Sequence, residues 1–267
     1  MEKQTFQKER LEEPEVLTLS SVLHKNRYLW AAKFSKNKKV LDIACGTGYG
    51  MNILTTKGKA KKIIGGDNSQ EALKIAKQKY SAFNTIFVNV DANKKLPFKK
   101  NYFDLVVSFE TIEHLKNYSL FISEIKRILK PKGIFLISTP HKRFHTPLGR
   151  KPANYFHTKE WYPQELYNFL KKYFYEVKLF KQLKIKKPFQ RMLYAFIQGK
   201  IIAPFWDKLD PQRKGKLYEL IKIKIFDKIF PSRHLSKKDL KKILKNTLVQ
   251  KGNPKNDYLV ILAKCRK

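Results

Sequence analysis

A chain of 267 residues with 42% hydrophobic side chains can bury one sizeable core and a smaller appended unit. Its 57 basic and 22 acidic residues give a net charge of +35, and two cysteines, Cys45 and Cys265, exclude a disulfide framework in practice. We expect a cytoplasmic protein, because residues 1–15 lack the apolar stretch of a signal peptide and no apolar run reaches about 18 residues.

The first predicted element is a helix over residues 16–34. Leu19, Leu23 and Trp30 supply apolar positions along it, and Arg27 lies on the same helix. A guanidinium fork can bind a carboxylate through two hydrogen bonds, although a surface charge on a packing helix is an equally ordinary interpretation. Residues 1–36 are therefore predicted to form an N-terminal helical cap.

A glycine-rich loop follows at residues 42–50, directly after the apolar pair Val40–Leu41. Gly46, Gly48 and Gly50 allow positive φ angles and a close approach of the backbone to a ligand. The spacing excludes a phosphate-binding P-loop, because Met51–Asn52 stands where that motif requires Lys and Ser or Thr. It also differs from the G-x-G-x-x-G pattern of dinucleotide sites.

Further strands, each closed by polar residues, follow this loop. Residues 61–66 read as a strand ending at Asp67, and Asn68–Ser69 then caps a helix. Residues 85–90 form the next β-branched run, closed by Asp91–Ala92. Residues 103–108 predict a fourth strand with Glu110–His114 at its end, before a helix over 118–129 and a strand over 134–138.

In this order and spacing, these segments resemble the motifs of class I S-adenosylmethionine-dependent methyltransferases, with Ala44 at the first glycine of their Asp/Glu-x-Gly-x-Gly-x-Gly loop. The resemblance implies that Asp67 and Asn68 meet the ribose, and that Asp91 holds the adenine amino group while Ala92 leaves room for the ring. The complete set of implied cofactor-binding residues is Arg27, Tyr28, Asp42, Ala44, Gly46, Gly48, Gly50, Asp67, Asn68, Asp91, Ala92 and Glu110. Arg27 and Tyr28 are expected to meet the methionine carboxylate.

The fold implied by the resemblance is α/β, with a seven-stranded, mostly parallel Rossmann-like sheet and helices on both faces. Residues 1–182 and 255–267 form the predicted core, and residues 176–182 and 257–263 are its sixth and seventh strands. Between them, residues 183–254 carry 19 basic and 5 acidic side chains and repeat apolar residues at helical spacing. We expect a lysine-rich helical insertion before the last strand.

Three side chains after the fourth strand are the predicted catalytic residues. A helical turn would place Glu110, Glu113 and His114 on one face, at positions i, i+3 and i+4. Methyl transfer to a hydroxyl requires removal of a proton, and histidine is a common general base, which makes His114 the candidate for this role. The competing interpretation is structural, a helix cap with a hydrogen-bonded histidine.

A metal interpretation also exists, because Glu-x-x-Glu-His resembles the metal-binding motif of ubiquinone-pathway and small-RNA methyltransferases. Glu110, Glu113, His114 and the downstream His157 would then hold Mg²⁺ or a transition metal, with His141 and His145 as further candidates. Methyltransferases without known metal dependence share this string. The base or orienting role is therefore preferred, and no metal is predicted.

The acceptor is expected to be a sugar or a glycan or lipid-linked precursor, methylated on oxygen. Similar bacterial and archaeal sequences that act on such molecules share the strings found here at residues 46–50, 109–114, 138–140 and 156–160. The alternatives are metal-assisted RNA ribose 2′-O-methylation, and a non-catalytic protein of this fold that binds anionic polymers or membranes. The charge of +35 favours an anionic partner, RNA or the inner membrane surface, unless it only reflects composition. The sequence does not predict an oligomeric state.

Overall fold

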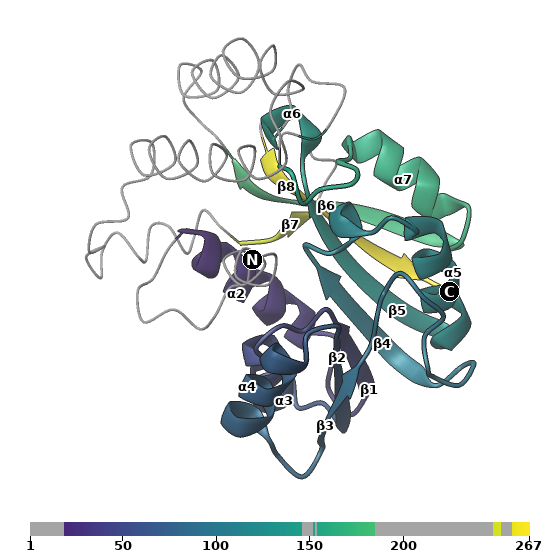
Figure 1. Cartoon of the computed structure of the whole chain (residues 1–267). Coiled ribbons are helices and arrows are strands. Elements are labelled where there is room, and N and C mark those ends of the chain that lie inside the picture. The colour runs from purple at the N-terminus through teal and green to yellow at the C-terminus, as the bar shows by residue number, and fades with distance from the viewer. Residues whose placement is uncertain (1–18, 146–151, 153, 185–247, 252–257) are drawn as a thin grey trace.

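A computed structural model of the chain describes residues 19–145, 152, 154–184, 248–251 and 258–267 (Figure 1). Most of the predicted insertion, residues 185–247, and residues 1–18 of the predicted cap lie outside this described part. None of the described helices is both long and apolar enough to cross a membrane.

The described residues contain a single eight-stranded sheet in the order β3-β2-β1-β4-β5-β8-β6-β7. The strands are β1 Lys39–Ile43, β2 Lys62–Asp67, β3 Thr85–Asn89, β4 Phe103–Phe109, β5 Leu129–Pro140, β6 Glu176–Lys184, β7 Gln250–Lys251 and β8 Tyr258–Arg266. Strands β1 to β5 are parallel, and β8 runs antiparallel between β5 and β6. The strand order reverses between β1 and β4, and open α/β sheets bind ligands beyond the carboxyl ends of the strands at such a point.

The predicted Rossmann-like sheet is confirmed, but the count of seven strands was wrong by one. The additional strand, β7, pairs with the outer edge of β6 through Phe180↔Lys251 and Lys181↔Gln250. Its two residues fall inside the predicted insertion. A two-residue polar strand has no hydrophobic alternation, so only its neighbour in space defines it.

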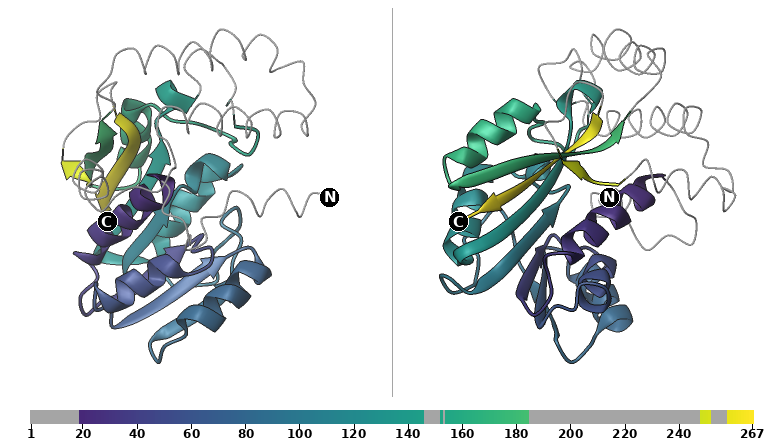
Figure 2. Two further views of the ribbon diagram at one scale, coloured as in Figure 1. Left: turned by 90° about the vertical axis from the view of Figure 1, so that its left-hand side faces the viewer. Right: turned by 180° about the vertical axis from the view of Figure 1, so that it is seen from behind.

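Both faces of the sheet are apolar and covered by helices (Figures 1 and 2). Neighbouring strand residues point to opposite faces: Leu41 and Val106 belong to one core, whereas Val40, Leu105 and Val107 belong to the other. The first core packs against α5 (Tyr118–Ile128) and α7 (Pro163–Lys171), and the second against α2 (Leu19–Ala32), α3 (Tyr49–Thr56) and α4 (Gln70–Tyr80). Burial on both faces explains the nearly continuous apolar runs of the parallel strands.

Capping residues fix where the helices begin. The Ser69 hydroxyl accepts a hydrogen bond from the backbone N–H of Ala72 at the start of α4. The side chain of Asn117 accepts one from Leu120 N–H at the start of α5. In α7, Pro163 occupies the first turn, where its missing N–H is not needed, and Glu165 reaches back to the N–H of Tyr162.

The connection from β3 to β4 has no helix and is held by α5. The backbone N–H of Leu96 donates to Glu124 Oε2 at 2.8 Å. Arg127 donates to the carbonyl oxygens of Phe98, at 2.7 Å, and Leu96, at 2.9 Å, and it is paired with Glu124 at 2.6 Å. This arrangement keeps the buried side chain of Leu96 against the core.

We predict that Arg127→Ala lowers the free energy of unfolding by about 1.5–3 kcal/mol, the range for hydrogen bonds to a charged group. Lys126 is an exposed neighbour on the same helix, and Lys126→Ala is expected to change stability by less than about 0.5 kcal/mol. Urea denaturation measures both. Equal, small effects of the two substitutions would show that Arg127 does not secure the connection.

Candidate functional site

The predicted site residues meet at one edge of the sheet, where the parallel strands end (Figure 1). The glycine-rich loop joins β1 to α3, Asp67 is the last residue of β2, and Glu110 directly follows β4. Asp42 is paired in register with Gly65 of β2 and Val107 of β4. Asp91 and Ala92 follow β3 at the same edge.

The glycine-rich loop turns through three residues with positive φ: Ala44 at 60°, Gly46 at 55° and Gly48 at 85°. A Cβ atom built on Gly46 would meet nothing within 4 Å, so this part of the backbone borders open space. A Cβ atom on Gly50 would instead lie 2.1 Å from the ring of Tyr28. Gly46 thus leaves room for a ligand, while Gly50 lets α2 and α3 approach each other closely.

Asp67 ties the glycine-rich loop to the start of α4. Its carboxylate accepts the N–H of Gly46 at 2.8 Å and the N–H of Ser69 at 2.9 Å. Asn68, between the two contacts, is exposed. Beyond β3, Asp91 accepts the N–H of Asn93 at 2.8 Å, and Ala92 is 9% exposed.

Asp42 is fully buried, and the Tyr28 hydroxyl donates to its carboxylate at 3.1 Å. Burial raises the pKa of Asp42 to about 8; the hydrogen bond from Tyr28 opposes this shift and the charge of Asp67 adds to it. Burial also raises the pKa of Tyr28. A cationic group brought next to Asp42 would favour its ionised form.

Arg27 is also buried, and its partner is Glu110. Arg27 Nη1 lies 2.5 Å from Glu110 Oε1 and donates to Ser138 Oγ at 3.1 Å. Ser138 in turn donates to Glu110 Oε1 at 2.7 Å. Arg27 is therefore neutralised within the protein, and a contact with a methionine carboxylate stays a prediction.

The predicted helical face of Glu110, Glu113 and His114 was wrong. Glu110 takes the left-handed conformation, with φ 53°, and precedes a short 3₁₀ turn, η2, that covers only Ile112–His114. Glu110 is paired with Arg27, and its positive φ interrupts the regular helical turn that would have placed the three side chains on one face. Sequence spacing assumed regular helix geometry, which a left-handed residue interrupts.

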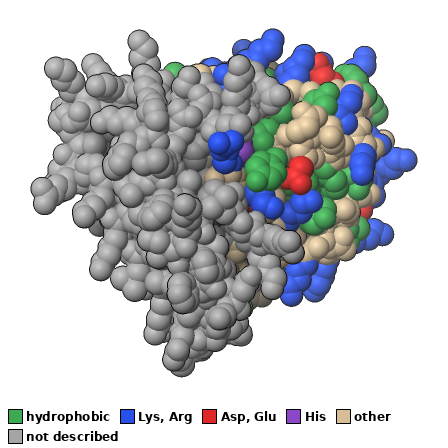
Figure 3. Space-filling model, turned by 90° about the horizontal axis from the view of Figure 1, so that it is seen from above, with side chains coloured by type: hydrophobic (Ala, Val, Ile, Leu, Met, Phe, Trp, Pro, Cys, Tyr) green, Lys and Arg blue, Asp and Glu red, His purple; other side chains and the backbone are tan. Residues whose placement is uncertain are grey.

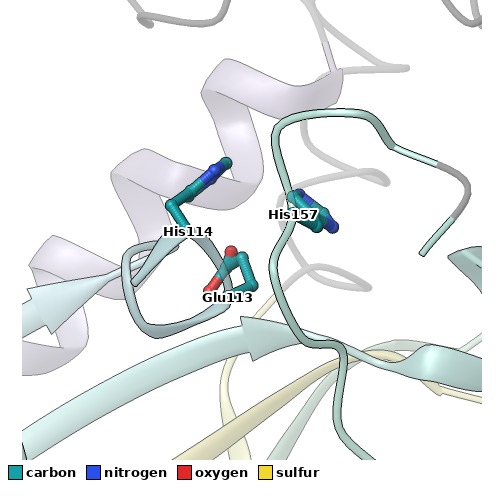
Figure 4. A group of neighbouring side chains, drawn as sticks. All are labelled: Glu113, His114 and His157. Carbon is teal, nitrogen blue, oxygen red and sulfur yellow. The ribbon is translucent and has the colours of Figure 1, made fainter. Parts of the chain in front are cut away.

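Glu113, His114 and His157 converge in space (Figure 4). One potential ligand atom from each lies within 4.8 Å of the others. The rings of His114 and His157 are edge to face, with centroids 4.8 Å apart. Glu110 is absent from this group, so the geometry unites three of the four residues in the predicted metal set.

The remaining histidine candidates lie elsewhere or are not described. The side chain of His141 is buried and accepts the N–H of Arg143 at 3.0 Å, and the backbone of His141 forms an isolated β-bridge with Trp161. The side chain of His145, in the short helix α6 (Lys142–His145), lies outside the described residues.

Hydrogen bonds hold this cluster of Glu113, His114 and His157 in place. Glu113 Oε2 accepts the Thr139 hydroxyl at 3.0 Å. His114 Nδ1 lies 3.0 Å from the carbonyl oxygen of Phe156, and His157 Nδ1 lies 2.8 Å from Glu160 Oε1. Burial, and next the charge of Glu110, raise the pKa of Glu113.

Three further side chains contribute to this site, and of these the role of Asn93 was missed in the sequence. His24 and the Tyr49 hydroxyl form a hydrogen bond beside Tyr28 and Phe109, and burial, with the charge of Arg27, lowers the pKa of His24. The side chain of Asn93 accepts the N–H groups of Lys116 at 2.9 Å and Asn117 at 3.2 Å. Asn93 thus links the loop after β3 to the turn that carries His114.

Basic side chains are distributed over the described surface. Seen from above, Lys and Arg alternate with apolar and uncharged groups and do not gather in one patch (Figure 3). This pattern agrees with the even spread of lysine along the sequence.

Comparison with known proteins places this geometry in context. Residues 41–137 match a family described as a methyltransferase domain. Over 154 residues the chain is 32% identical to a protein of Mycolicibacterium smegmatis named "Probable S-adenosylmethionine-dependent methyltransferase", and the match covers 58% of each chain. The chain thus spans little more than half the length of this relative.

Two further comparisons extend the similarity. Over 112 residues the chain is 28% identical to a fatty-acid O-methyltransferase of Mycolicibacterium smegmatis, covering 42% of this chain and 40% of that one. The solved structure of an S-adenosylmethionine-dependent methyltransferase from Mesorhizobium loti has a TM-score of 0.58 at 13% identity, covering 94% of this chain and 100% of that one. At this identity the structural match shows the fold alone.

We predict that Asp42→Asn removes a pH dependence of stability. The pKa of Asp42 rises from 3.8 to about 8 on folding, so the folded chain binds this proton more tightly. Wild-type stability then falls as pH rises between these values, by at most about 1.36 kcal/mol per unit. The amide that replaces the carboxyl group does not titrate, so the variant should gain stability relative to wild type between about pH 5 and about pH 8.

Urea denaturation at several pH values measures this difference. Parallel pH profiles for the two proteins would contradict the assigned shift at Asp42.

Proposed function

We propose that the protein is a class I S-adenosylmethionine-dependent methyltransferase that O-methylates a sugar or a glycan or lipid-linked precursor, on the premise that residues 41–137 match a methyltransferase domain. The observation that carries the proposal is the meeting of two features at one sheet edge. A glycine-rich loop borders open space at Gly46, and the Glu113–His114–His157 cluster follows the neighbouring strand β4. The open space at the loop suits the methyl donor, and the cluster suits an acceptor hydroxyl.

The donor S-adenosylmethionine would lie along the ends of β1, β2 and β3. Asp67 and Asn68 would meet the ribose, and Asp91 with Ala92 the adenine. Near the methionine end, the buried carboxyl of Asp42 gives a favourable place for a positively charged ligand group. Arg27 and Glu110 form an ion pair whose two charges complement the carboxylate and ammonium of an amino acid.

His114 is the proposed proton acceptor in the absence of a metal. The carbonyl oxygen of Phe156 can only accept a hydrogen bond, so Nδ1 of His114 must donate to it. In the neutral imidazole this leaves the lone pair on Nε2, which can accept the proton of a hydroxyl as its oxygen attacks the methyl group. Glu113, whose carboxyl group accepts the Thr139 hydroxyl, is held next to His114 in this cluster.

Oxygen as the acceptor atom is supported by the relatives. The fatty-acid O-methyltransferase methylates an oxygen, and an acceptor hydroxyl matches the need for a base at His114. The protein is proposed to act in the cytoplasm or at the inner membrane surface, where its charge of +35 would attract acidic lipids.

RNA ribose 2′-O-methylation is the second candidate, favoured by the cluster of Glu113 with two histidines and by the net charge. A non-catalytic protein that binds anionic polymers or membranes is the third. It would have no need of a base oriented beside a donor site.

We predict that Gly46→Ala weakens the binding of S-adenosylmethionine at least about tenfold, equivalent to about 1.4 kcal/mol. The added methyl group meets no protein atom and so enters the space assigned to the donor, and the φ of 55° at Gly46 strains the loop backbone as well. Gly66→Ala is the matched control, because its Cβ would lie 3.4 Å from Val90, an ordinary contact distance. Calorimetry measures both affinities, and unchanged affinity in Gly46→Ala would place the donor elsewhere.

We predict that His114→Ala lowers the rate of methyl transfer at least about a hundredfold, the lower range for loss of a general base, while donor affinity stays within about twofold. Lys116→Ala, at an exposed neighbour, should keep full activity. The assay follows labelled methyl groups from S-adenosylmethionine into cell-extract fractions of lipid-linked sugars, lipids and RNA.

The labelled fraction decides among the candidate functions. Label in the sugar or lipid fraction supports the proposal, and label confined to RNA favours the second candidate. Absence of label in all fractions, with donor binding intact, supports the non-catalytic one. Full activity of His114→Ala would exclude this residue as the base.

A further inference from the structure

We propose that Glu113, His114 and His157 bind one divalent transition-metal ion, and that Glu160 holds His157 in its ligating orientation. The inference rests on the proposed function and concerns the acceptor side of that site: a bound ion would occupy Nε2 of His114 and take over its role toward the acceptor hydroxyl. Metal binding itself can be measured without methyl transfer, so the two proposals can fail separately.

The ligands come from two segments that the backbone joins firmly. Glu113 and His114 lie on the η2 turn, and His157 lies on the connection from β5 to α7. The N–H of Thr158 donates to the carbonyl oxygen of Glu113 at 2.6 Å, and the Thr158 hydroxyl donates to that of Leu115 at 2.7 Å. These bonds hold the three side chains on facing segments (Figure 4).

A buried oxygen of Glu113 points to a ligand. The side chain is 0% exposed, and Oε2 accepts the Thr139 hydroxyl. Within the described residues, Oε1 is buried without a hydrogen-bond partner. A buried carboxyl oxygen that lacks a hydrogen-bond donor is unfavourable, and a bound cation would compensate this loss.

The two histidines are oriented as metal ligands are. Each has Nδ1 within hydrogen-bond distance of an oxygen, the carbonyl of Phe156 for His114 and the carboxylate of Glu160 for His157. Donation from Nδ1 places the lone pair on Nε2 in both rings. A carboxylate behind a histidine is a common support of metal ligands, because it fixes the ring and makes the coordinating nitrogen more basic.

Two imidazoles and one carboxylate favour Zn²⁺ or a similar transition metal over Mg²⁺, which prefers oxygen ligands. Ligands at about 2.1 Å in a tetrahedral site lie about 3.4 Å apart. In the structure the candidate ligand atoms lie within 4.8 Å of one another, so the three side chains would move slightly closer together to bind an ion. Glu110 is paired with Arg27 and is not one of the three ligands. A bound ion would therefore keep a coordination position for the acceptor hydroxyl, and it would lower the pKa of that hydroxyl.

The test titrates the metal-stripped full-length protein with Co²⁺ and follows the visible absorption of the bound ion, with Zn²⁺ and Mg²⁺ as competitors. We expect one site, displacement of Co²⁺ by Zn²⁺ but not by Mg²⁺, and a higher unfolding temperature with Zn²⁺. Glu113→Gln and His157→Ala should lose the absorption. Glu160→Gln should weaken binding about 10–100-fold.

Glu165→Gln alters an exposed carboxylate on α7 and serves as the matched control, with wild-type affinity expected. The proposal is overturned if wild type shows neither the absorption nor the stabilisation, or if Glu113→Gln and His157→Ala bind Co²⁺ as wild type does. Wild-type protein that transfers methyl groups but binds neither Co²⁺ nor Zn²⁺ would reject the metal site while leaving the proposed function intact.

Discussion

The site depends on the carboxylate of Asp67 more than on any other group. It accepts N–H bonds from Gly46, in the loop after β1, and from Ser69, at the start of α4. One side chain at a strand end thus sets the positions of two adjacent loops. The two bonds hold Gly46, which borders open space, and Ser69, which caps α4, on the same carboxylate.

One ion pair and one buried hydrogen bond connect the N-terminal helix to the same edge of the sheet. Arg27 and Tyr28 of α2 contact Glu110 and Asp42 respectively. Buried ion pairs contribute little net stability, but removing one partner leaves an uncompensated charge that costs about 3–5 kcal/mol. These contacts therefore serve to position α2 over the strand ends more than to stabilise the fold. A donor that binds there would meet groups already ordered.

The sequence predicted the features that local pattern determines, and missed those that depend on contacts between distant segments. Apolar runs and the spacing of Asp42, Asp67 and Asp91 predicted the sheet and the residues at its edge. The prediction that Glu110 shares a helical face with Glu113 and His114 failed because Glu110 has a left-handed backbone conformation. Its carboxylate is paired with Arg27 of the distant helix α2. Strand β7 and the contacts of Asn93 likewise depend on partners that no local pattern identifies.

Titration of the protein with S-adenosylmethionine in a calorimeter tests the central claim most directly. The account predicts one binding site in wild type and at least about a hundredfold weaker binding in Asp67→Ala, a loss of about 2.7 kcal/mol. Glu71→Ala, at an exposed acid on α4, should bind as wild type. Absence of binding to wild type, or equal affinity in Asp67→Ala, would contradict the assignment of the donor site to this edge of the sheet.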